Sequence, residues 1–327
     1  MVDAFTAGSV FSLFTRDDNR GKAITALAIT DDKKNFLTGT VDGTIVSWNF
    51  ATGEASIVSP DLHTAPIVRL AVANGKLFSV AHDALVKVTP VGDSGNKLHV
   101  DGITPWLKRR LPIDTLDLAV SADGKFAVVA CPEHFGVYSL RVDGPNTWDN
   151  ISKFGARCKP TSVALAPSHD EFIFGTQDSK LYVYHLLQLD AWNTCYKIHD
   201  VIQLTVQPTA LAYSLDGKHL AVATSTGKVV LMKIGDQRKW HFEREWEIHY
   251  RRVNCVSWSP DGRRFATGSS DEDIIVWDLQ KVTERPVIIR AAHNLTAVNG
   301  IVWLDSETLV TAGGDGNVRK WIVPLKN

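Results

Sequence analysis

A set of four residue types recurs at a fixed spacing in this chain, and no other feature constrains the fold as strongly. A histidine is followed after 18 positions by a threonine, after 4 more by an aspartate and after 6 more by a tryptophan, and this happens twice. The two sets are His249, Thr267, Asp271 and Trp277, and His293, Thr311, Asp315 and Trp321. Because self-similarity at a fixed period is the signature of repeat architectures, the pattern indicates an array of similar units.

Weaker copies of the pattern extend the array along the chain. Thr38, Asp42 and Trp48 keep the spacings of 4 and 6, although position 20, where the histidine would fall, is an arginine. The turn positions 42, 83, 132, 178, 226, 271 and 315 lie 41 to 49 residues apart. They predict seven units, over 17–58, 59–105, 106–153, 154–203, 204–245, 246–288 and 289–327. A period of about 40–45 residues is typical of a four-stranded propeller blade.

Each unit has the composition of short strands joined by tight turns. Runs such as 24–29, 36–40 and 45–48 are rich in apolar and β-branched residues, which favour strands. Turn sequences such as Ser-Leu-Asp-Gly at 214–217 separate the runs, and their glycine supplies a positive φ. We therefore expect an all-β, seven-bladed β-propeller that forms a single domain over 1–327.

The N-terminal segment is expected to complete the last blade. The last unit ends near residue 323 and leaves no sequence for a fourth strand, whereas 9–14 alternates well and lies upstream of the first unit. Pairing 9–14 as the outermost strand of the last blade would join the two ends of the chain. It would also remove an open sheet edge, which otherwise promotes aggregation.

The repeated polar residues allow two interpretations. A threonine, a histidine and an aspartate resemble the nucleophile, base and orienting group of an enzyme. Yet partial sets occur in other units, for example His63 with Asp83 in the second, where the aromatic residue is lost. A device repeated from blade to blade fits a structural role better: the histidine bonds the aspartate, and the threonine links the histidine to the tryptophan. We expect no catalytic residue.

Charge and cysteine content narrow the class of protein. Thirty-five Lys and Arg against thirty-six Asp and Glu give a net charge of −1, which excludes a broadly basic nucleic-acid-binding domain. No apolar stretch approaches the ~18 residues of a membrane span, and the N-terminus lacks a signal-peptide pattern. The four cysteines form no Cys-x-x-Cys pair, which favours free thiols over a disulfide framework or a zinc site. We expect a cytoplasmic protein without metal, cofactor, nucleic acid or membrane.

Two basic segments are candidates for contact with other proteins. Lys108, Arg109 and Arg110 follow a tryptophan in a stretch of loop length between the second and third units, and Trp and Arg are favoured at interfaces. The alternative for this segment is a solvated loop. Tyr250, Arg251 and Arg252 directly follow the histidine of the sixth unit, which places them beside loops at one end of the propeller. The acidic run 271–273 could bind a cation, but a solvated turn is the simpler interpretation.

The repeated pattern resembles the WD40 family, and three segments narrow the likeness. They are Gly-Lys-Ala-Ile-Thr-Ala-Leu at 21–27, His-Thr-Ala-Pro-Ile-Val-Arg-Leu at 63–70 and Trp-Leu-Asp-Ser-Glu-Thr-Leu-Val-Thr at 303–311. In these segments, and in the order of its units from about 9 to 323, the chain resembles the C-terminal propeller of the actin-interacting protein 1 family. Members of that family typically have two propellers of about this size.

The resemblance implies a function. It implies a non-enzymatic protein, cytoplasmic and cytoskeletal, that binds actin filaments with cofilin and promotes filament disassembly, or a single-propeller module of such a protein. We expect a monomer that contacts other proteins through the propeller faces. A generic WD40 scaffold that gathers proteins unrelated to actin is the alternative. An enzyme would need converging reactive groups in the central channel, and the sequence offers none.

Overall fold

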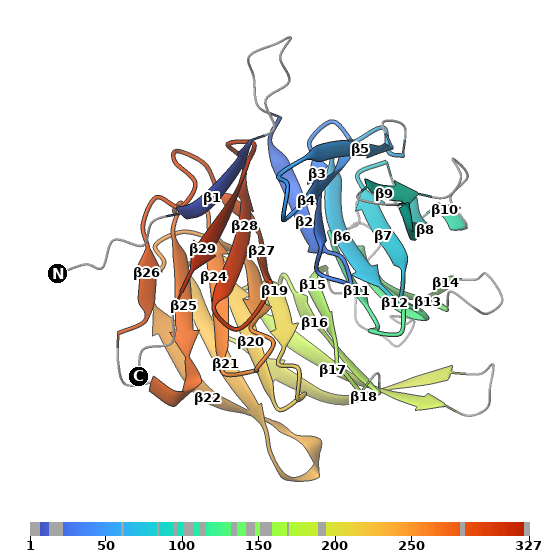
Figure 1. Cartoon of the computed structure of the whole chain (residues 1–327). Coiled ribbons are helices and arrows are strands. Elements are labelled where there is room, and N and C mark those ends of the chain that lie inside the picture. The colour runs from blue at the N-terminus through green and yellow to red at the C-terminus, as the bar shows by residue number, and fades with distance from the viewer. Residues whose placement is uncertain are drawn as a thin grey trace.

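The computed structural model describes residues 7–12, 22–59, 62–83, 85–94, 97–100, 107–110, 116–131, 136–141, 148–150, 159–168, 170–188, 194–281 and 285–323. Within these ranges the chain forms 29 strands, β1 to β29, and two 3₁₀ helices, η2 (Asp236–Arg238) and η3 (Leu279–Lys281). The described strands form seven antiparallel sheets, which stand side by side around a common axis (Figure 1).

The sheets follow one another along the chain. The first holds β2 (Ile24–Ile29), β3 (Asn35–Thr40), β4 (Ile45–Asn49) and β5 (Ala55–Ser59), and the second β6 (Ile67–Ala73), β7 (Lys76–Ala81), β8 (Leu85–Ser94), β9 (Lys97–Val100) and β10 (Leu107–Arg110). The third holds β11 (Asp117–Val120), β12 (Phe126–Cys131), β13 (Gly136–Arg141) and β14 (Trp148–Asn150), and the fourth β15 (Pro160–Leu165), β16 (Glu171–Thr176), β17 (Lys180–Gln188) and β18 (Thr194–Gln203). The fifth holds β19 (Pro208–Tyr213), β20 (His219–Thr224), β21 (Lys228–Ile234) and β22 (Trp240–Glu247), and the sixth β23 (Val253–Trp258), β24 (Arg264–Ser269), β25 (Ile274–Asp278) and β26 (Val287–Ile289). The seventh holds β27 (Val298–Trp303), β28 (Thr308–Gly313), β29 (Asn317–Ile322) and β1 (Ala7–Ser12). The first-named strand of each sheet is its innermost.

The second strand of a sheet is buried because another sheet packs on either side. All six residues of β3, β12, β16, β24 and β28 are buried. The apolar run Phe-Ala-Val-Val-Ala-Cys of β12 supplies both faces, as a strand buried on both faces requires. Polar turns connect the innermost strand of a sheet to the second strand. In the turn between β19 and β20, Ser214 donates to the carboxylate of Asp216, and Gly217 takes a φ of +69°, which favours glycine.

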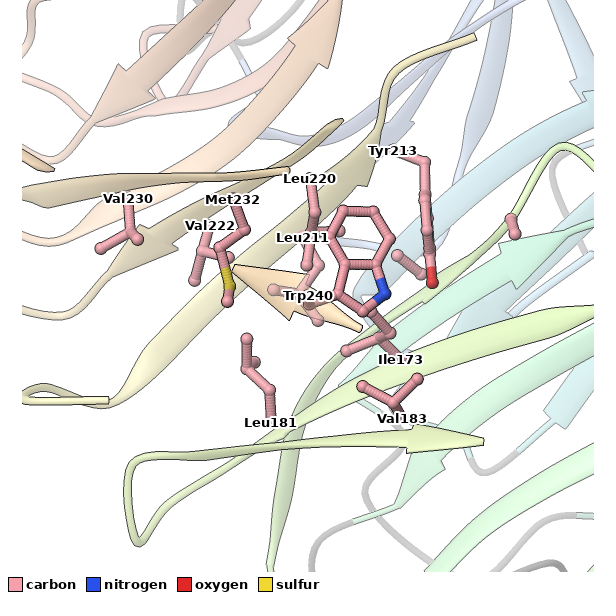
Figure 2. Close-up of a cluster of buried hydrophobic side chains, with 12 residues drawn as sticks. Ile173, Leu181, Val183, Leu211, Tyr213, Leu220, Val222, Val230, Met232 and Trp240 are labelled. Carbon is pink, nitrogen blue, oxygen red and sulfur yellow. The ribbon is translucent and has the colours of Figure 1, made fainter. Parts of the chain in front are cut away.

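Seven clusters of buried apolar side chains, one between each pair of successive sheets in the described part of the chain, hold the sheets together. The cluster between the fourth and fifth sheets packs Leu181 and Val183 against Met232 and Trp240 (Figure 2). Another cluster joins side chains of the first sheet, such as Trp48, to those of the seventh. The first and last sheets are therefore in contact, and apolar burial acts around the ring.

The seventh sheet contains strands from both ends of the described chain. β1 pairs antiparallel with β29, with Val10 opposite Arg319 and Ser12 opposite Asn317. The sequence predicts an N-terminal strand over 9–14, and the structure has β1 two residues earlier, over Ala7–Ser12. The predicted all-β class is confirmed.

The loop expected near residues 106–111 is a wrong prediction. The structure has strand β10 there, hydrogen-bonded to β8 with Lys108 opposite Lys87. β8 is long, and its two halves pair with different strands, residues 91–94 with β9 and 85–88 with β10. The segment Leu-Lys-Arg-Arg has no apolar alternation to mark it as a strand, so its conformation follows from the free edge of β8. The second sheet thus extends to Arg110, beyond the predicted unit boundary at 105.

Candidate functional site

One end of the ring gathers most of the candidate residues, and we call it the entry face. It is the end at which the innermost strands begin. It consists of the loops that lead into these strands and of the turns between the second and third strands of each sheet. The antiparallel registers bring both kinds of segment to this end, since Val253 at the start of β23 lies opposite Ser269 at the end of β24.

In the sixth sheet, the four repeated residues form one hydrogen-bonded set. His249 Nδ1 lies 3.0 Å from Asp271 Oδ2, and His249 Nε2 lies 2.9 Å from Thr267 Oγ1. The indole N–H of Trp277 donates to the same Oγ1 at 3.0 Å. All polar groups are satisfied when a neutral imidazole donates from Nδ1 to the carboxylate and accepts the threonine proton at Nε2. The set ties the loop before β23 to the turn after β24.

The seventh sheet repeats this geometry. His293 lies 2.8 Å from Asp315 Oδ1 and 2.9 Å from Thr311 Oγ1, which accepts from the Trp321 indole at 2.9 Å. Burial lowers the pKa of His293 and Arg319 lowers it further, while Asp315 acts in the opposite direction. Burial alone would raise the pKa of Asp315, but the hydrogen bond from His293 leads the contributions that hold it below its ordinary value. The neutral imidazole and the charged carboxylate are thus the favoured states.

In the first sheet, a lysine ammonium and not an imidazole bonds the aspartate. Trp48 donates to Thr38 Oγ1 at 2.9 Å, as in the complete sets. The carboxylate of Asp42 accepts from the Lys22 ammonium and the Thr40 hydroxyl. Burial opposes ionisation, but these hydrogen bonds lower the pKa of Asp42 to about 2. Position 20, where the spacing places the histidine, lies outside the described residues.

The second sheet has a histidine without the aromatic residue. His63 lies 2.9 Å from Asp83 Oδ2 and 2.8 Å from Ser79 Oγ. Ser79 stands four positions before the aspartate, as the threonines of the other sets do. Ser79 does not stand out in the sequence because the spacing from histidine to aspartate is 20 here instead of 22. The spacing of four residues from Ser79 to Asp83 is the signal in the sequence that identifies this serine.

The complete sets are inaccessible to a substrate. The side chains of Thr267 and Thr311 are fully buried, and His249 and His293 are at most 3% exposed. A nucleophile must reach the reacting atom of its substrate, and these hydroxyls are enclosed by their own sheets. The arrangement is suited to holding loops in place.

The candidate contact residues fall into separate environments. Tyr250 is 65% exposed on the entry face, although its hydroxyl donates to the Asp271 carbonyl at 3.2 Å. Arg251 and Arg252 are also exposed residues, and Arg252 lines a cavity described below. Lys108, Arg109 and Arg110 lie on β10, at the outer edge of the second sheet. The structure does not bring the two basic segments together.

The three acidic side chains of the run 271–273 are already bonded to other groups of this chain. Asp271 accepts from His249, Glu272 accepts from the backbone N–H of Leu295, and Asp273 forms an ion pair with Arg290 at 2.7 Å. Across the described residues, no group of three or more His, Cys, Asp or Glu side chains could hold a metal ion. Burial raises the pKa of the Cys255 thiol to about 12, which makes it unreactive. In the part of the chain that the structure describes, no helix is long and apolar enough to cross a membrane.

Two exposed apolar side chains on the entry face escaped the sequence analysis. Leu295, in the loop before β27, is 83% exposed, and Val41, in the turn after β3, is 47% exposed. We call these two side chains and Tyr250 the apolar rim; they lie on the seventh, first and sixth sheets, which are neighbours in the ring. Only the ring geometry brings them to one face, because they belong to three different sheets.

The centre of the entry face is a cavity of about 210 Å³ at the mouth of the channel. Its lining takes one residue from the start of six innermost strands, with Leu116 directly before β11 and Arg252 directly before β23. The residues are Thr25, Arg69, Leu116, Thr161, Thr209, Arg252, Asn254 and Asn299. Several of them sit where the register of the inner strand shifts, for example Thr209 between Pro208 and Ala210. Such a bulge redirects a side chain locally.

Most of these lining residues bond from one sheet to the next. The hydroxyl of Thr161 donates to the Pro208 carbonyl at 2.7 Å and that of Thr209 to the Val253 carbonyl at 2.6 Å. Asn254 donates to the Val298 carbonyl at 3.2 Å and Asn299 to the Ile24 carbonyl at 2.8 Å. A girdle of hydrogen bonds therefore links the fourth, fifth, sixth, seventh and first sheets in sequence.

An ion pair continues the girdle between the second and third sheets. Arg69 Nε donates to Asp117 Oδ1 at 2.8 Å, and Asp117 Oδ2 accepts from the backbone N–H of Val163 in the fourth sheet at 2.9 Å. Burial would lower the pKa of Arg69, but Asp117 raises it above its ordinary value. The guanidinium is thus a permanent charge at the channel mouth. Arg69 and Asp117 are 48 residues apart, and no motif marked them.

Comparisons with known proteins agree with the repeat pattern. The family profile "WD domain, G-beta repeat" matches residues 12–49, 240–278 and 285–321. The chain is 36% identical over 305 residues to "Actin-interacting protein 1" of Caenorhabditis elegans, covering 93% of this chain and 47% of that protein. It is 29% identical over 293 residues to "WD repeat-containing protein 1" of Gallus gallus, covering 89% and 44%. The chain spans about half the length of the curated relatives it matches.

A solved structure shares the fold. It is the Cps50 (Swd1) β-propeller domain of Myceliophteria thermophila, with a TM-score of 0.77 and 15% sequence identity, covering 98% of this chain and 100% of that one. This likeness shows the architecture alone. The chain therefore contains WD40 repeats and has the fold of a WD40 β-propeller.

Proposed function

We propose that the chain is a non-enzymatic module that binds actin filaments and cooperates with cofilin in their disassembly. The observation that carries this proposal is the 36% identity, over 93% of this chain, to a protein named for its interaction with actin. Relatives from Drosophila melanogaster and Gallus gallus, 27% and 29% identical, cover a similar share of the chain. Cofilin enters through the family resemblance described above. The proposal places the chain in the cytoplasm, at the cytoskeleton.

The proposal assigns partner contact to the entry face. The exposed side chains of Tyr250 and Leu295 flank the turn at Asp271, since Tyr250 bonds Asp271 and Leu295 bonds the adjacent glutamate. Arg251 and Arg290 lie beside them and are exposed. Aromatic side chains and arginines are enriched among the residues that contribute most to interfaces.

The number of blades and the closure of the ring also bear on the proposed function. We infer that the ring works as seven blades and that β1 locks it by pairing with β29. This inference rests on the register of these two strands and on the apolar contact between the first and last sheets. A rigid ring would hold the loops of the entry face in one arrangement and so limit the entropy lost on binding.

Co-sedimentation with actin filaments, with and without cofilin, tests the proposed function. The chain is expected to pellet with filaments, and more strongly when cofilin is present. Tyr250→Ala together with Leu295→Ala is expected to raise the apparent Kd by about 10-fold. Phe242→Ala is the matched control, because Phe242 is 61% exposed on the outer strand β22 and lies away from the entry face. Absence of the chain from both pellets would refute an actin-related role.

A generic scaffold is the second candidate. The apolar rim of Val41, Tyr250 and Leu295 would serve a partner other than actin equally well, and a shared fold does not determine the partner. This alternative predicts no pelleting with filaments in either condition, together with one partner that is recovered from cytosol and loses affinity in the Tyr250 and Leu295 double variant but not in Phe242→Ala.

A further inference from the structure

The channel mouth carries a positive charge that its own carboxylate does not balance. Two guanidinium groups, of Arg69 and Arg252, line the cavity, and Asp117 is the one carboxylate paired with them among the residues that the structure describes. The carboxylate of Asp117 already accepts from Arg69 and from the backbone N–H groups of Leu118 and Val163. Among the described residues, no hydrogen bond or ion pair reaches the guanidinium of Arg252.

Among the groups that line the cavity, the two arginines are the main hydrogen-bond donors still able to bind a ligand. The hydroxyl hydrogens of Thr25, Thr161 and Thr209 are committed to backbone carbonyls. Arg69 uses Nε for Asp117 and Nη1 for the Val68 carbonyl, which leaves Nη2 for a ligand. Burial lowers the pKa of Arg252, and the nearby charge of Arg69 lowers it further. An anion between the two groups would relieve this repulsion.

The size of the cavity selects the kind of ligand. A volume of about 210 Å³ holds roughly seven waters at ~30 Å³ each. Pockets for organic ligands commonly measure about 300–1,000 Å³, so this cavity is smaller than a typical cofactor site. One side chain with a carboxylate would fit.

The surroundings favour a ligand delivered by a protein. The cavity opens at the centre of the entry face, the same face that carries the apolar rim of Val41, Tyr250 and Leu295. A small free anion would not contact or bury the exposed apolar side chains around its site. A partner that covers the rim would bury them and at the same time exclude water from the two arginines, which strengthens charge-assisted hydrogen bonds.

We propose that the channel mouth receives an acidic side chain of a docked protein, whose carboxylate binds between Arg69 and Arg252. This inference rests on the proposed protein-binding function and adds the chemistry of one contact. The guanidinium of Arg252 matches a carboxylate with two parallel hydrogen bonds, which a lysine at this position could not supply.

Fluorescence anisotropy with a labelled hexaglutamate peptide tests the proposal on the full chain, with hexaglutamine as the uncharged reference peptide. Hexaglutamate is expected to bind and hexaglutamine is not. Arg252→Gln is expected to weaken hexaglutamate binding by about 10-fold or more, because charge-assisted hydrogen bonds are lost, and Arg252→Lys by less. Arg251→Gln is the matched control, since it removes the same charge one residue away and outside the cavity lining. Circular dichroism of each variant verifies folding.

Three outcomes would overturn the proposal. The first is equal weakening by Arg251→Gln and Arg252→Gln, which indicates diffuse electrostatic attraction. The second is no weakening by Arg252→Gln. The third is competition by inorganic phosphate at the affinity of the peptide itself, which indicates a site for a free anion. The co-sedimentation assay separates this proposal from the preceding one: hexaglutamate binding without filament binding refutes only the actin role, and the reverse refutes only the channel-mouth contact.

Discussion

At the scale of single residues, buried carboxylates hold the loops of the entry face. Asp271 is 3% exposed and accepts hydrogen bonds from His249 and from the backbone N–H groups of Tyr250 and Asp273. Asp271→Ala leaves these donors without a partner in a buried site. We expect a loss of about 1–3 kcal/mol in the free energy of unfolding, measured by urea denaturation.

Two further variants make this test specific. Asp271→Asn keeps an acceptor for His249 and is expected to lose less stability than Asp271→Ala. Glu54→Ala removes a carboxylate from an exposed position and is expected to change stability by less than about 0.5 kcal/mol. If the three variants were equally stable, the hydrogen-bonded set would have no structural role.

Buried histidines predict a loss of stability in mild acid. The pKa values of His63, His185, His219 and His293 are all lowered, with burial as the largest cause in each. As the pH falls through about 6.5, the unfolded chain takes up protons that the folded chain resists, so stability is full above this pH and declines below it. His293→Gln is expected to reduce the slope of unfolding free energy against pH, by at most about 1.4 kcal/mol per pH unit. Denaturation series from pH 7.5 to 5.5 measure it; identical slopes in both proteins would contradict the assignment.

At the scale of elements, the period of the sequence predicts those strands whose own residues decide their conformation. β3 and β24 have continuous buried runs. A Ser-x-Asp-Gly turn precedes β24, and in it Ser259 donates to the carboxylate of Asp261. β10 escaped because its conformation depends on the edge of β8 and not on its own pattern. Lys22 was not predicted for a similar reason: in the first sheet an ammonium group at a different position bonds the aspartate, whereas a histidine does so in other sheets. The spacing therefore identifies the histidine–aspartate bond, but not a different residue that bonds the aspartate in place of the histidine.

Close packing between neighbouring elements predicts that two glycines differ in how much stability is lost when each is replaced by alanine. Gly227 has a φ of +96°, and a Cβ there would collide with the His249 carbonyl on the loop of the next sheet. Gly262 has a φ of +67° and no atom near the corresponding position. Gly262→Ala is expected to cost about 1 kcal/mol through backbone strain, and Gly227→Ala at least about 2 kcal/mol more through the collision. Thermal unfolding of both variants measures the difference, and equal losses would show that the turn and the loop are not in close contact.

At the scale of the whole molecule, the proposed contact features combine residues from different sheets. Arg69 and Arg252 are 183 positions apart in the sequence, and they meet because innermost strands of different sheets surround one channel. The rim of Val41, Tyr250 and Leu295 forms in the same way, from turns and loops of three sheets. The sequence predicts the units and their order, but a pattern within one unit contains no information on which residues of distant units face each other across the axis.

The N-terminal strand supplies the last prediction, which concerns the ring as a unit. β1 is the outer neighbour of β29, and without it the hydrogen-bonding groups on the outer side of β29 would face water as an open edge. Deleting residues 1–12 removes several backbone hydrogen bonds worth about 1 kcal/mol each and is expected to lower Tm by roughly 5 °C or more. Deleting residues 1–6 leaves β1 (Ala7–Ser12) in place and is the matched control. Calorimetry measures both, and gel filtration at high concentration is expected to show association only of the longer deletion, because an open edge pairs with other chains. Equal Tm values for the two deletions would show that the ring is stable through its apolar interfaces alone, with β1 as a dispensable addition.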